Sequence, residues 1–183
     1  MKVTETKLQG CFILEPMKYG DSRGYFMESF NEKTFNEVTR TEVHFVQDNQ
    51  SYSTRGVLRG LHAQRGEYAQ AKLVRVLHGE VLDIAVDVRV GSATFGQYIA
   101  VTLSDENNLQ LFVPRGFLHG FVVLSETATF FYKCDNFYKK ESECGVDPLD
   151  SDLAIDWQIP VYDMLLSDKD KEAQSFAEFK ATL

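Results

Sequence analysis

Short segments of alternating apolar and polar residues fill the middle of this chain and constrain its fold more than any other feature. Period-two alternation is typical of β-strands. Aromatic residues, at 13% of the chain with 14 Phe and 8 Tyr, also favour strands over helices. Many short strands joined by turns indicate a closed or sandwiched β structure whose alternate side chains point inward. Strands are expected over residues 45–53, 57–62, 71–77, 81–88, 97–103, 109–113, 119–124 and 128–134.

Both ends of the chain carry signals of peripheral elements. The N-terminal part is expected to be extended, with a turn at residues 19–24. A short helix is expected from Asn31 to Thr39, with Asn31 as its N-cap residue. Residues 167–179 predict a loop and an amphipathic helix packed on the outside. Because no repeat, low-complexity tract or linker is present, residues 1–183 are expected to form a single domain.

Charge and cysteine content limit the partners and the compartment. The formal net charge of −8 argues against nucleic acid as the main partner, since binding to a phosphate backbone needs a basic face. Cys11, Cys134 and Cys144 lack CxxC spacing and indicate neither a disulfide framework nor a zinc site. The sequence contains no long apolar run and no secretory signal. A cytoplasmic protein without a membrane partner is therefore expected.

Glycine, histidine and proline recur in the predicted barrel at a recognisable spacing. The pattern comprises Gly60, His62, Gln64, Lys72 and Gly79, followed by Pro114, Gly116 and His119. It resembles the cupin pattern, in which His-x-His, a glutamate and a later histidine bind a metal. Gln64 stands where the second histidine would be, and Lys72 stands where the glutamate would be.

This resemblance implies an all-β fold, a double-stranded β-helix (cupin, jelly-roll barrel) with a few short peripheral helices. A protonated lysine has no lone pair and repels cations. Because Lys72 replaces a ligand, the cavity is expected to hold no metal.

Strand alternation predicts the direction of the polar side chains. Lys72 shares a face with Val74, and His62 shares one with Leu58, so both are expected to point into the barrel. Two simpler interpretations stay open: Lys72 exposed at the fraying end of its strand, and His62 as a hydrogen-bonded core residue. The convergence of His62, Lys72 and His119 favours a functional cavity.

Such a cavity has the groups needed for proton transfer next to a ketone. An imidazole can abstract a proton near neutral pH, an ammonium group can stabilise an enolate, and a tyrosine can return a proton. The sequence contains no Ser or Cys nucleophile motif, glycine-rich phosphate loop or GxGxxG motif that would indicate acyl, phosphoryl or hydride transfer.

Longer blocks of the sequence resemble one enzyme family. They are residues 21–28, 47–49, 56–62, 71–74, 83–89, 92–96, 114–121 and 166–170. In this order they resemble the dTDP-4-dehydrorhamnose 3,5-epimerase family over nearly the whole chain. The resemblance implies a homodimeric cupin without metal or nucleotide cofactor that acts on a dTDP-4-keto-6-deoxy sugar. The implied reaction inverts C3 and C5 of dTDP-4-dehydro-6-deoxy-D-glucose to yield dTDP-4-dehydro-L-rhamnose, in dTDP-L-rhamnose biosynthesis.

The resemblance also implies roles for individual catalytic residues. His62 corresponds to the general base, and Asp170 corresponds to the carboxylate that orients it. Lys72 corresponds to the cation that stabilises the enolate oxygen. Tyr132 corresponds to the acid that delivers a proton to the opposite face of the sugar.

Substrate-binding roles follow in the same way. Arg23 and Arg59 correspond to pyrophosphate ligands, for which the guanidinium geometry is suited. Tyr138 corresponds to the residue that stacks against thymine. The further substrate-contact positions are Glu28, Gln47, Asp48, Asn49, Lys72, His119, Glu143 and Lys169.

Several alternatives stay open at this point. Apart from the family match, Tyr132 reads as a core aromatic residue with a hydrogen-bonded hydroxyl, and Glu143 reads as a charge on a solvated turn. Ala63 replaces a bulky aromatic residue usual in the family, and the segment from Gly145 to Pro148 lacks a tryptophan, which leaves the exact sugar open. The alternative functions are a 3-epimerase or ketoisomerase on a related nucleotide sugar, and a nucleotide-sugar-binding cupin without catalysis.

Overall fold

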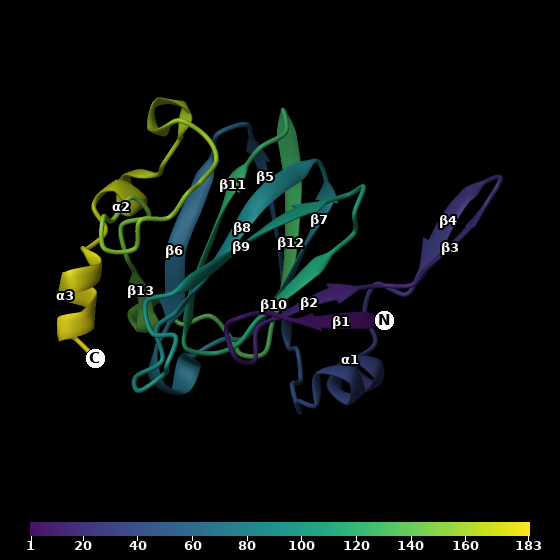
Figure 1. Ribbon diagram of the computed structural model, residues 1–183, viewed down its shortest axis with the longest axis horizontal. Coiled ribbons are helices and arrows are strands. Elements are labelled where there is room, and N and C mark those ends of the chain that lie inside the picture. Colours follow the sequence, from purple (N-terminus) through teal and green to yellow (C-terminus); the bar gives the residue numbers. More distant parts are fainter.

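The computed structural model describes all residues, Met1–Leu183, and contains two antiparallel sheets that face each other (Figure 1). The six-stranded sheet contains, in spatial order, β1 (Lys2–Glu5), β2 (Phe12–Glu15), β10 (Gln110–Val113), β7 (Lys72–His78), β12 (Thr127–Cys134) and β5 (Gln47–Thr54). The five-stranded sheet contains β13 (Glu143–Gly145), β6 (Leu58–Gln64), β11 (Phe117–Val123), β8 (Glu80–Asp87) and β9 (Tyr98–Ser104). Successive strands from β5 to β8 alternate between the sheets. The double-stranded β-helix expected from the sequence is confirmed.

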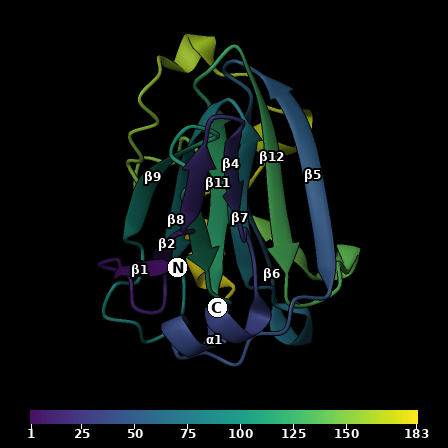
Figure 2. The ribbon, with the colours of Figure 1, turned by 90° about the vertical axis from the view of Figure 1, so that its right-hand side faces the viewer.

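Peripheral elements flank the barrel. The hairpin of β3 (Lys18–Asp21) and β4 (Gly24–Met27) projects from the sheets in Figure 1. Figure 2 shows α1 (Glu32–Thr39) below the ends of β5, β7 and β12. The other helical elements are η1 (Gly66–Tyr68), η2 (Lys140–Ser142), η3 (Val161–Asp163), α2 (Asp168–Lys171) and α3 (Phe176–Ala181).

Two sequence predictions about the helices can be compared with these elements. As predicted, Asn31 caps α1, because its side chain accepts a hydrogen bond from the backbone N–H of Thr34. The single C-terminal helix that was predicted is instead two short helices, α2 and α3. None of the helices combines the length and the apolar character that crossing a membrane requires.

The five-stranded sheet is buried on both faces. Its inner face contributes to a core between the sheets, which includes Phe121 of β11 and Phe130 of β12. Its outer face is covered by the chain that follows β13, and there Trp157 and Phe179 belong to one cluster with Leu82 of β8. Burial on both sides explains why β8 and β11 are nearly continuous apolar runs.

A bulge in β6 changes which of its side chains face the interior. His62 lies opposite His119 of β11, Arg59 lies opposite Phe121, and the register shifts between these two pairs. Two residues of β6 therefore oppose one residue of β11. Gly60 lies at the shift with a φ of +128°, and no larger residue fits there, since a Cβ atom would lie 2.6 Å from the Cα atom of the facing glycine of β11.

Because of this bulge, the side chains of β6 do not alternate as the sequence predicted. Leu58 and Leu61 belong to the outer cluster of the five-stranded sheet, whereas Arg59 and His62 line the interior cavity. His62 points inward as predicted, but the prediction that it shares a face with Leu58 was wrong. The reason is that the extra residue of a bulge interrupts the period-two pattern.

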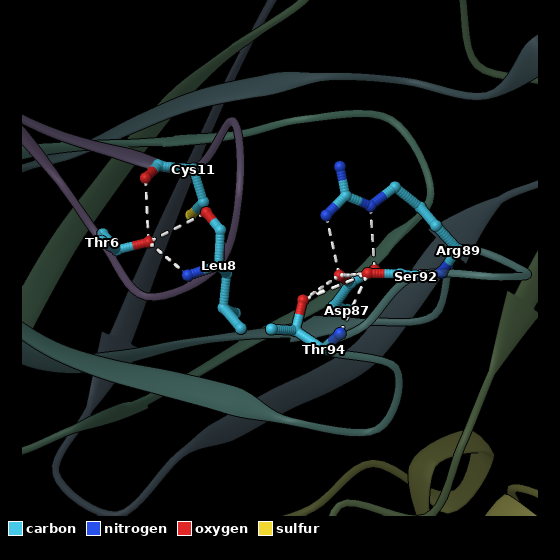
Figure 3. Close-up of polar contacts among 7 residues, drawn as sticks. All are labelled: Thr6, Leu8, Cys11, Asp87, Arg89, Ser92 and Thr94. Carbon is cyan, nitrogen blue, oxygen red and sulfur yellow. Dashed lines mark hydrogen bonds and ion pairs between the residues drawn. The ribbon is translucent and has the colours of Figure 1, made fainter.

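Asp87 organises the connection between β8 and β9 (Figure 3). Its buried carboxylate accepts hydrogen bonds from Arg89 Nε at 2.9 Å, Ser92 Oγ at 2.6 Å and Thr94 Oγ1 at 2.6 Å. Burial opposes the ionisation of Asp87, but the donors outweigh it and hold the pKa of the carboxyl below its usual range. In the same view, the hydroxyl of Thr6 donates a hydrogen bond to the carbonyl of Cys11 across a nearby turn.

Replacing Asp87 with Asn should destabilise the fold by about 1.5–3 kcal/mol, the range for losing hydrogen bonds to a charged group. The pKa of Asp87 is lower in the folded than in the unfolded state, so its stabilisation is complete above the unfolded pKa of about 4 and is lost as the pH falls below it. The difference in free energy of unfolding between wild type and Asp87→Asn, measured by urea titration, should therefore be constant at pH 6–8 and shrink in acid. Asp152→Asn, which alters an exposed ion pair with Lys180, serves as control. A difference independent of pH down to about pH 2 would contradict the prediction.

Candidate active site

A cavity of about 530 Å³ opens between the two sheets. His62, Lys72 and His119 all line it, so the convergence predicted from their spacing is present. The other polar residues around it are Asn49, Gln50, Ser51, Arg59, Tyr132, Ser167 and Asp170. An adjoining recess of about 260 Å³ shares His62, Lys72 and Tyr132 with this cavity and extends toward Tyr138.

His62 of β6 forms a hydrogen-bonded pair with Asp170 of α2. Its Nε2 atom lies 2.6 Å from Oδ1 of Asp170, and Ser167 donates its hydroxyl to Oδ2 at 2.8 Å. Burial opposes the ionisation of Asp170, but the hydrogen bonds from His62 and Ser167 outweigh it and lower the pKa of the carboxyl. An ionised Asp170 holds the proton of the imidazole on Nε2. Nδ1 has no hydrogen-bond partner in the protein and can accept a proton from a ligand.

A second histidine–aspartate pair lies in the same sheet. His119 Nε2 is 3.0 Å from both carboxylate oxygens of Asp83, and both residues are buried. Burial raises the pKa of Asp83, although His119 and Lys72 act in the opposite direction. Sequence analysis missed Asp83 as a site residue. The available signal was an acidic residue between the apolar residues Leu82 and Ile84 in the middle of a strand, because a buried carboxylate needs a partner.

Lys72 and Tyr132 belong to the opposite sheet, on β7 and β12. The Nζ atom of Lys72 lies 5.7 Å from the centroid of the Tyr132 ring. Lys72 forms no hydrogen bond or ion pair within the protein, and burial lowers the pKa of its ammonium group. Its three donors are therefore free to bind an anionic or carbonyl oxygen of a ligand.

Tyr132 also has an unpaired polar group in the cavity. Its hydroxyl forms no hydrogen bond with the protein, unlike the hydrogen-bonded core tyrosine that was the alternative interpretation. Burial raises the pKa of Tyr132, which keeps the phenol protonated at neutral pH. Because His62 and Tyr132 come from facing sheets, a ligand between them has a base on one side and an acid on the other.

The residues at the four cupin ligand positions do not fit a divalent metal. The ammonium group of Lys72 offers no lone pair. The carboxylates on His62 and His119 occupy only Nε2 of each ring, so these two histidines alone keep a nitrogen that could bind a metal. The carboxamide of Gln64 is hydrogen-bonded to backbone groups outside the cavity. No group of three or more His, Cys, Asp or Glu side chains is arranged to hold a metal ion.

Several predicted substrate-contact residues lie at the rim of the cavity. Glu143 accepts a hydrogen bond from the Tyr138 hydroxyl at 3.1 Å and pairs with Lys169 Nζ at 2.5 Å. Gln47 and Asn49 line the recess next to Tyr138. Arg59 lines the main cavity, where its Nε atom donates to Ser53 and the rest of the guanidinium group has no protein partner.

Three predicted residues do not reach the cavity. Arg23 lies at the tip of the projecting β3–β4 hairpin and pairs with Asp21 at 2.5 Å. Glu28 is exposed and accepts a hydrogen bond from the capping residue of α1. Asp48 lies on the outer face of β5 and pairs with Lys133 at 2.9 Å.

Comparisons with known proteins agree with this geometry. The family model described as dTDP-4-dehydrorhamnose 3,5-epimerase matches residues 5–178. A dTDP-4-dehydrorhamnose 3,5-epimerase of Shigella flexneri is 53% identical over 178 residues, which is 97% of both chains. The crystal structure of the Elizabethkingia anophelis enzyme of that name is 60% identical, with a TM-score of 0.94 over 97% of both chains. An epimerase from Legionella pneumophila in complex with dTDP-4-keto-L-rhamnose is 48% identical, with a TM-score of 0.94 over 99% of this chain and 95% of that one.

These matches cover almost the entire chain, and His62, Lys72 and His119 line one cavity inside the barrel, as their spacing predicted. The chain belongs to the dTDP-4-dehydrorhamnose 3,5-epimerase family of isomerases.

Proposed function

We propose that this protein inverts C3 and C5 of dTDP-4-dehydro-6-deoxy-D-glucose to form dTDP-4-dehydro-L-rhamnose, in dTDP-L-rhamnose biosynthesis. The observation that carries the proposal is the opposition of His62 and Tyr132 across one cavity, with the free ammonium group of Lys72 beside them. The relatives named above support the choice of substrate. No metal or nucleotide cofactor is part of the proposed reaction.

Each inversion is a proton transfer through an enolate. His62 Nδ1 takes the proton from C3, and the electron pair of the C–H bond moves into the C3–C4 bond. The negative charge passes to the 4-oxo oxygen, where Lys72 stabilises it. Tyr132 then donates its hydroxyl proton to the opposite face of C3. After both side chains have exchanged protons with solvent, the same steps at C5 complete the reaction.

The nucleotide is proposed to lie across the rim of the cavity. Arg59 has free guanidinium donors there and would bind the pyrophosphate. Tyr138, at the end of the adjoining recess, would stack against thymine, with Gln47, Asn49 and Glu143 around it. This arrangement places the sugar between His62 and Tyr132.

We also propose that the active form is a homodimer. The β3–β4 hairpin exposes Tyr19, Tyr25 and Phe26 by 65%, 56% and 70%. A hairpin of two short strands with exposed aromatic side chains is marginally stable alone. A second copy of the chain would cover these side chains, and Arg23 at the tip of the hairpin would then reach the cavity of the partner. The proposed compartment is the cytoplasm, because all three cysteines are free thiols.

The proposal is tested by incubating the protein with dTDP-4-dehydro-6-deoxy-D-glucose in deuterated water and locating the label by NMR. Label at both C3 and C5 of the product is expected. Label at C3 alone would identify the protein as a 3-epimerase instead. If the protein binds the sugar tightly but the sugar takes up no deuterium, the protein is a binding protein without catalysis.

Removing the base and removing the acid should have different effects. His62→Ala should abolish both solvent exchange and product formation, by at least about 10²–10⁴-fold, the usual effect of losing a general base. Tyr132→Phe should stay folded and form little product. Deuterium should still enter the recovered substrate, since His62 still forms the enolate. Both rates are read from the deuterium experiment. Normal inversion of both carbons by Tyr132→Phe would return Tyr132 to the role of a core aromatic residue.

Activity should survive treatment with a chelator, because Lys72 offers no lone pair at its cupin ligand position and the Gln64 carboxamide is bound to backbone groups. We expect the turnover number after exhaustive dialysis against EDTA to match that of untreated enzyme, with no gain on adding Zn²⁺, Mn²⁺ or Fe²⁺. An EDTA-treated enzyme that lost turnover and regained it with one of these metals would refute the proposed mechanism.

Arg23 should act in the site of the partner subunit. Arg23→Ala and His62→Ala homodimers should both be poorly active at low substrate concentration. In a dimer of one Arg23→Ala and one His62→Ala protomer, one site retains His62 and receives an intact Arg23. Co-expressed variants should therefore recover about a quarter of the wild-type activity, since half of the dimers are mixed and each has one complete site. If Arg23 serves its own protomer, co-expression restores nothing.

A further inference from the structure

Gln64 takes the place of a metal-binding histidine in the cupin pattern, and the structure assigns it a different task. We propose that Gln64 is a positioning residue that sets the location of the Tyr138 ring at the nucleotide end of the cavity. The inference rests on the proposed function, in which Tyr138 stacks against the base. In this inference, Gln64 affects nucleotide binding although it does not contact the substrate.

Gln64 holds the backbone on both sides of Tyr138. Its Nε2 atom donates to the carbonyl of Phe137 at 3.2 Å, and its Oε1 atom accepts from the backbone N–H of Lys139 at 2.6 Å. The second Nε2 hydrogen bonds to the carbonyl of Tyr68 at 2.9 Å. The residue is only 8% exposed, so these bonds are shielded from water. The carboxamide thus joins the backbone at Tyr68 to the backbone on either side of Tyr138, and both of its N–H groups are hydrogen-bonded.

The segment that carries Tyr138 depends on such side-chain bonds. Residues 135–139 form neither helix nor strand between β12 and η2. The backbone N–H of Tyr138 itself donates to Gln47 Oε1 at 3.2 Å. Two glutamine side chains, Gln64 and Gln47, therefore hold three consecutive residues. No strand pairing assists them, and the backbone adds one bond, from the N–H of Ser142 to the carbonyl of Lys139.

The Tyr138 ring has little else to hold it. The residue is 53% exposed, and its hydroxyl has one hydrogen bond, to Glu143. With so little support from packing, the place of the ring follows from the place of its backbone. A preorganised ring binds a base more tightly than a mobile one, because less conformational entropy is lost on binding. Gln64 thus acts on nucleotide affinity through Tyr138.

The chemistry of this position requires a carboxamide. The three partners are two carbonyl groups and one N–H group, so the side chain must both donate and accept. A glutamate would turn a carboxylate toward two carbonyl oxygens, and a methionine would leave all three groups unpaired. Methionine has a similar length and no charge, which makes Gln64→Met the cleaner test.

We would measure dTDP binding by calorimetry in a double-mutant cycle of Gln64→Met and Tyr138→Ala. Gln64→Met should weaken binding roughly tenfold and raise KM with kcat nearly unchanged, since the catalytic groups stay in place. In the Tyr138→Ala background it should weaken binding no further. Equal weakening in both backgrounds, or none in the wild-type background, would overturn the proposal.

A second readout does not depend on the ligand. Hydrogen exchange of the Tyr138 and Lys139 amides in the unliganded protein should be roughly tenfold faster in Gln64→Met. Unchanged exchange would refute the positioning role even if the protein binds dTDP. If the wild-type protein fails to bind dTDP, the proposed function falls, while faster exchange still supports the role of Gln64.

Asn36 supplies a matched control. Its carboxamide also donates to and accepts from the backbone of a loop, at Val43, but it lies on α1, away from the cavity. Asn36→Leu should lower stability and leave dTDP affinity and the exchange of the Lys139 amide unchanged. If Gln64→Met does not fold, Gln64→Asn keeps the carboxamide with a shorter reach and should show the same pattern in both measurements.

Discussion

The hydrogen bond between His62 and Asp170 joins two parts of the chain that are 108 residues apart. β6 carries the histidine in the barrel, whereas α2 carries the carboxylate on a segment that crosses the outer face of the sheet. The apolar cluster around Trp157 and Phe179 holds that segment in place. α2 has only 4 residues, and Ser167 caps it while also donating to the carboxylate of Asp170. The orientation of the proposed base thus depends on packing outside the cavity.

Charge in the cavity is organised by pairing some groups and leaving others unpaired. Asp83 and Asp170 are each hydrogen-bonded to a histidine, so their carboxylate oxygens are engaged within the protein. Lys72 and most of the Arg59 guanidinium have no partner and present their donors to a ligand. A chain with a formal net charge of −8 can therefore bind an anion, because the ligand responds to nearby groups more strongly than to the total charge.

The sequence predicted the strands well and the cavity in part. Lys72 points inward because alternation is unbroken from Lys72 to Val76, and the register of β7 with β12 shifts only beyond Val76. The prediction failed on β6, where the bulge depends on the close approach of Gly60 to the neighbouring strand. No local pattern reports such an approach. Asp83 was overlooked, although an acidic residue flanked by apolar residues in the middle of a strand is a usable signal.

By itself, the sequence determined the β-strands, the cap of α1 and the replacement of metal ligands by Gln64 and Lys72, because these follow from local periodicity and side-chain chemistry. Only the tertiary structure decided which groups meet. It paired Asp83 with His119, bound Gln64 to the backbone around Tyr138, and left Arg23 outside the cavity. Such contacts join residues far apart in the chain. They depend on strand register and on how the two sheets and the C-terminal segment pack, which residue spacing does not encode.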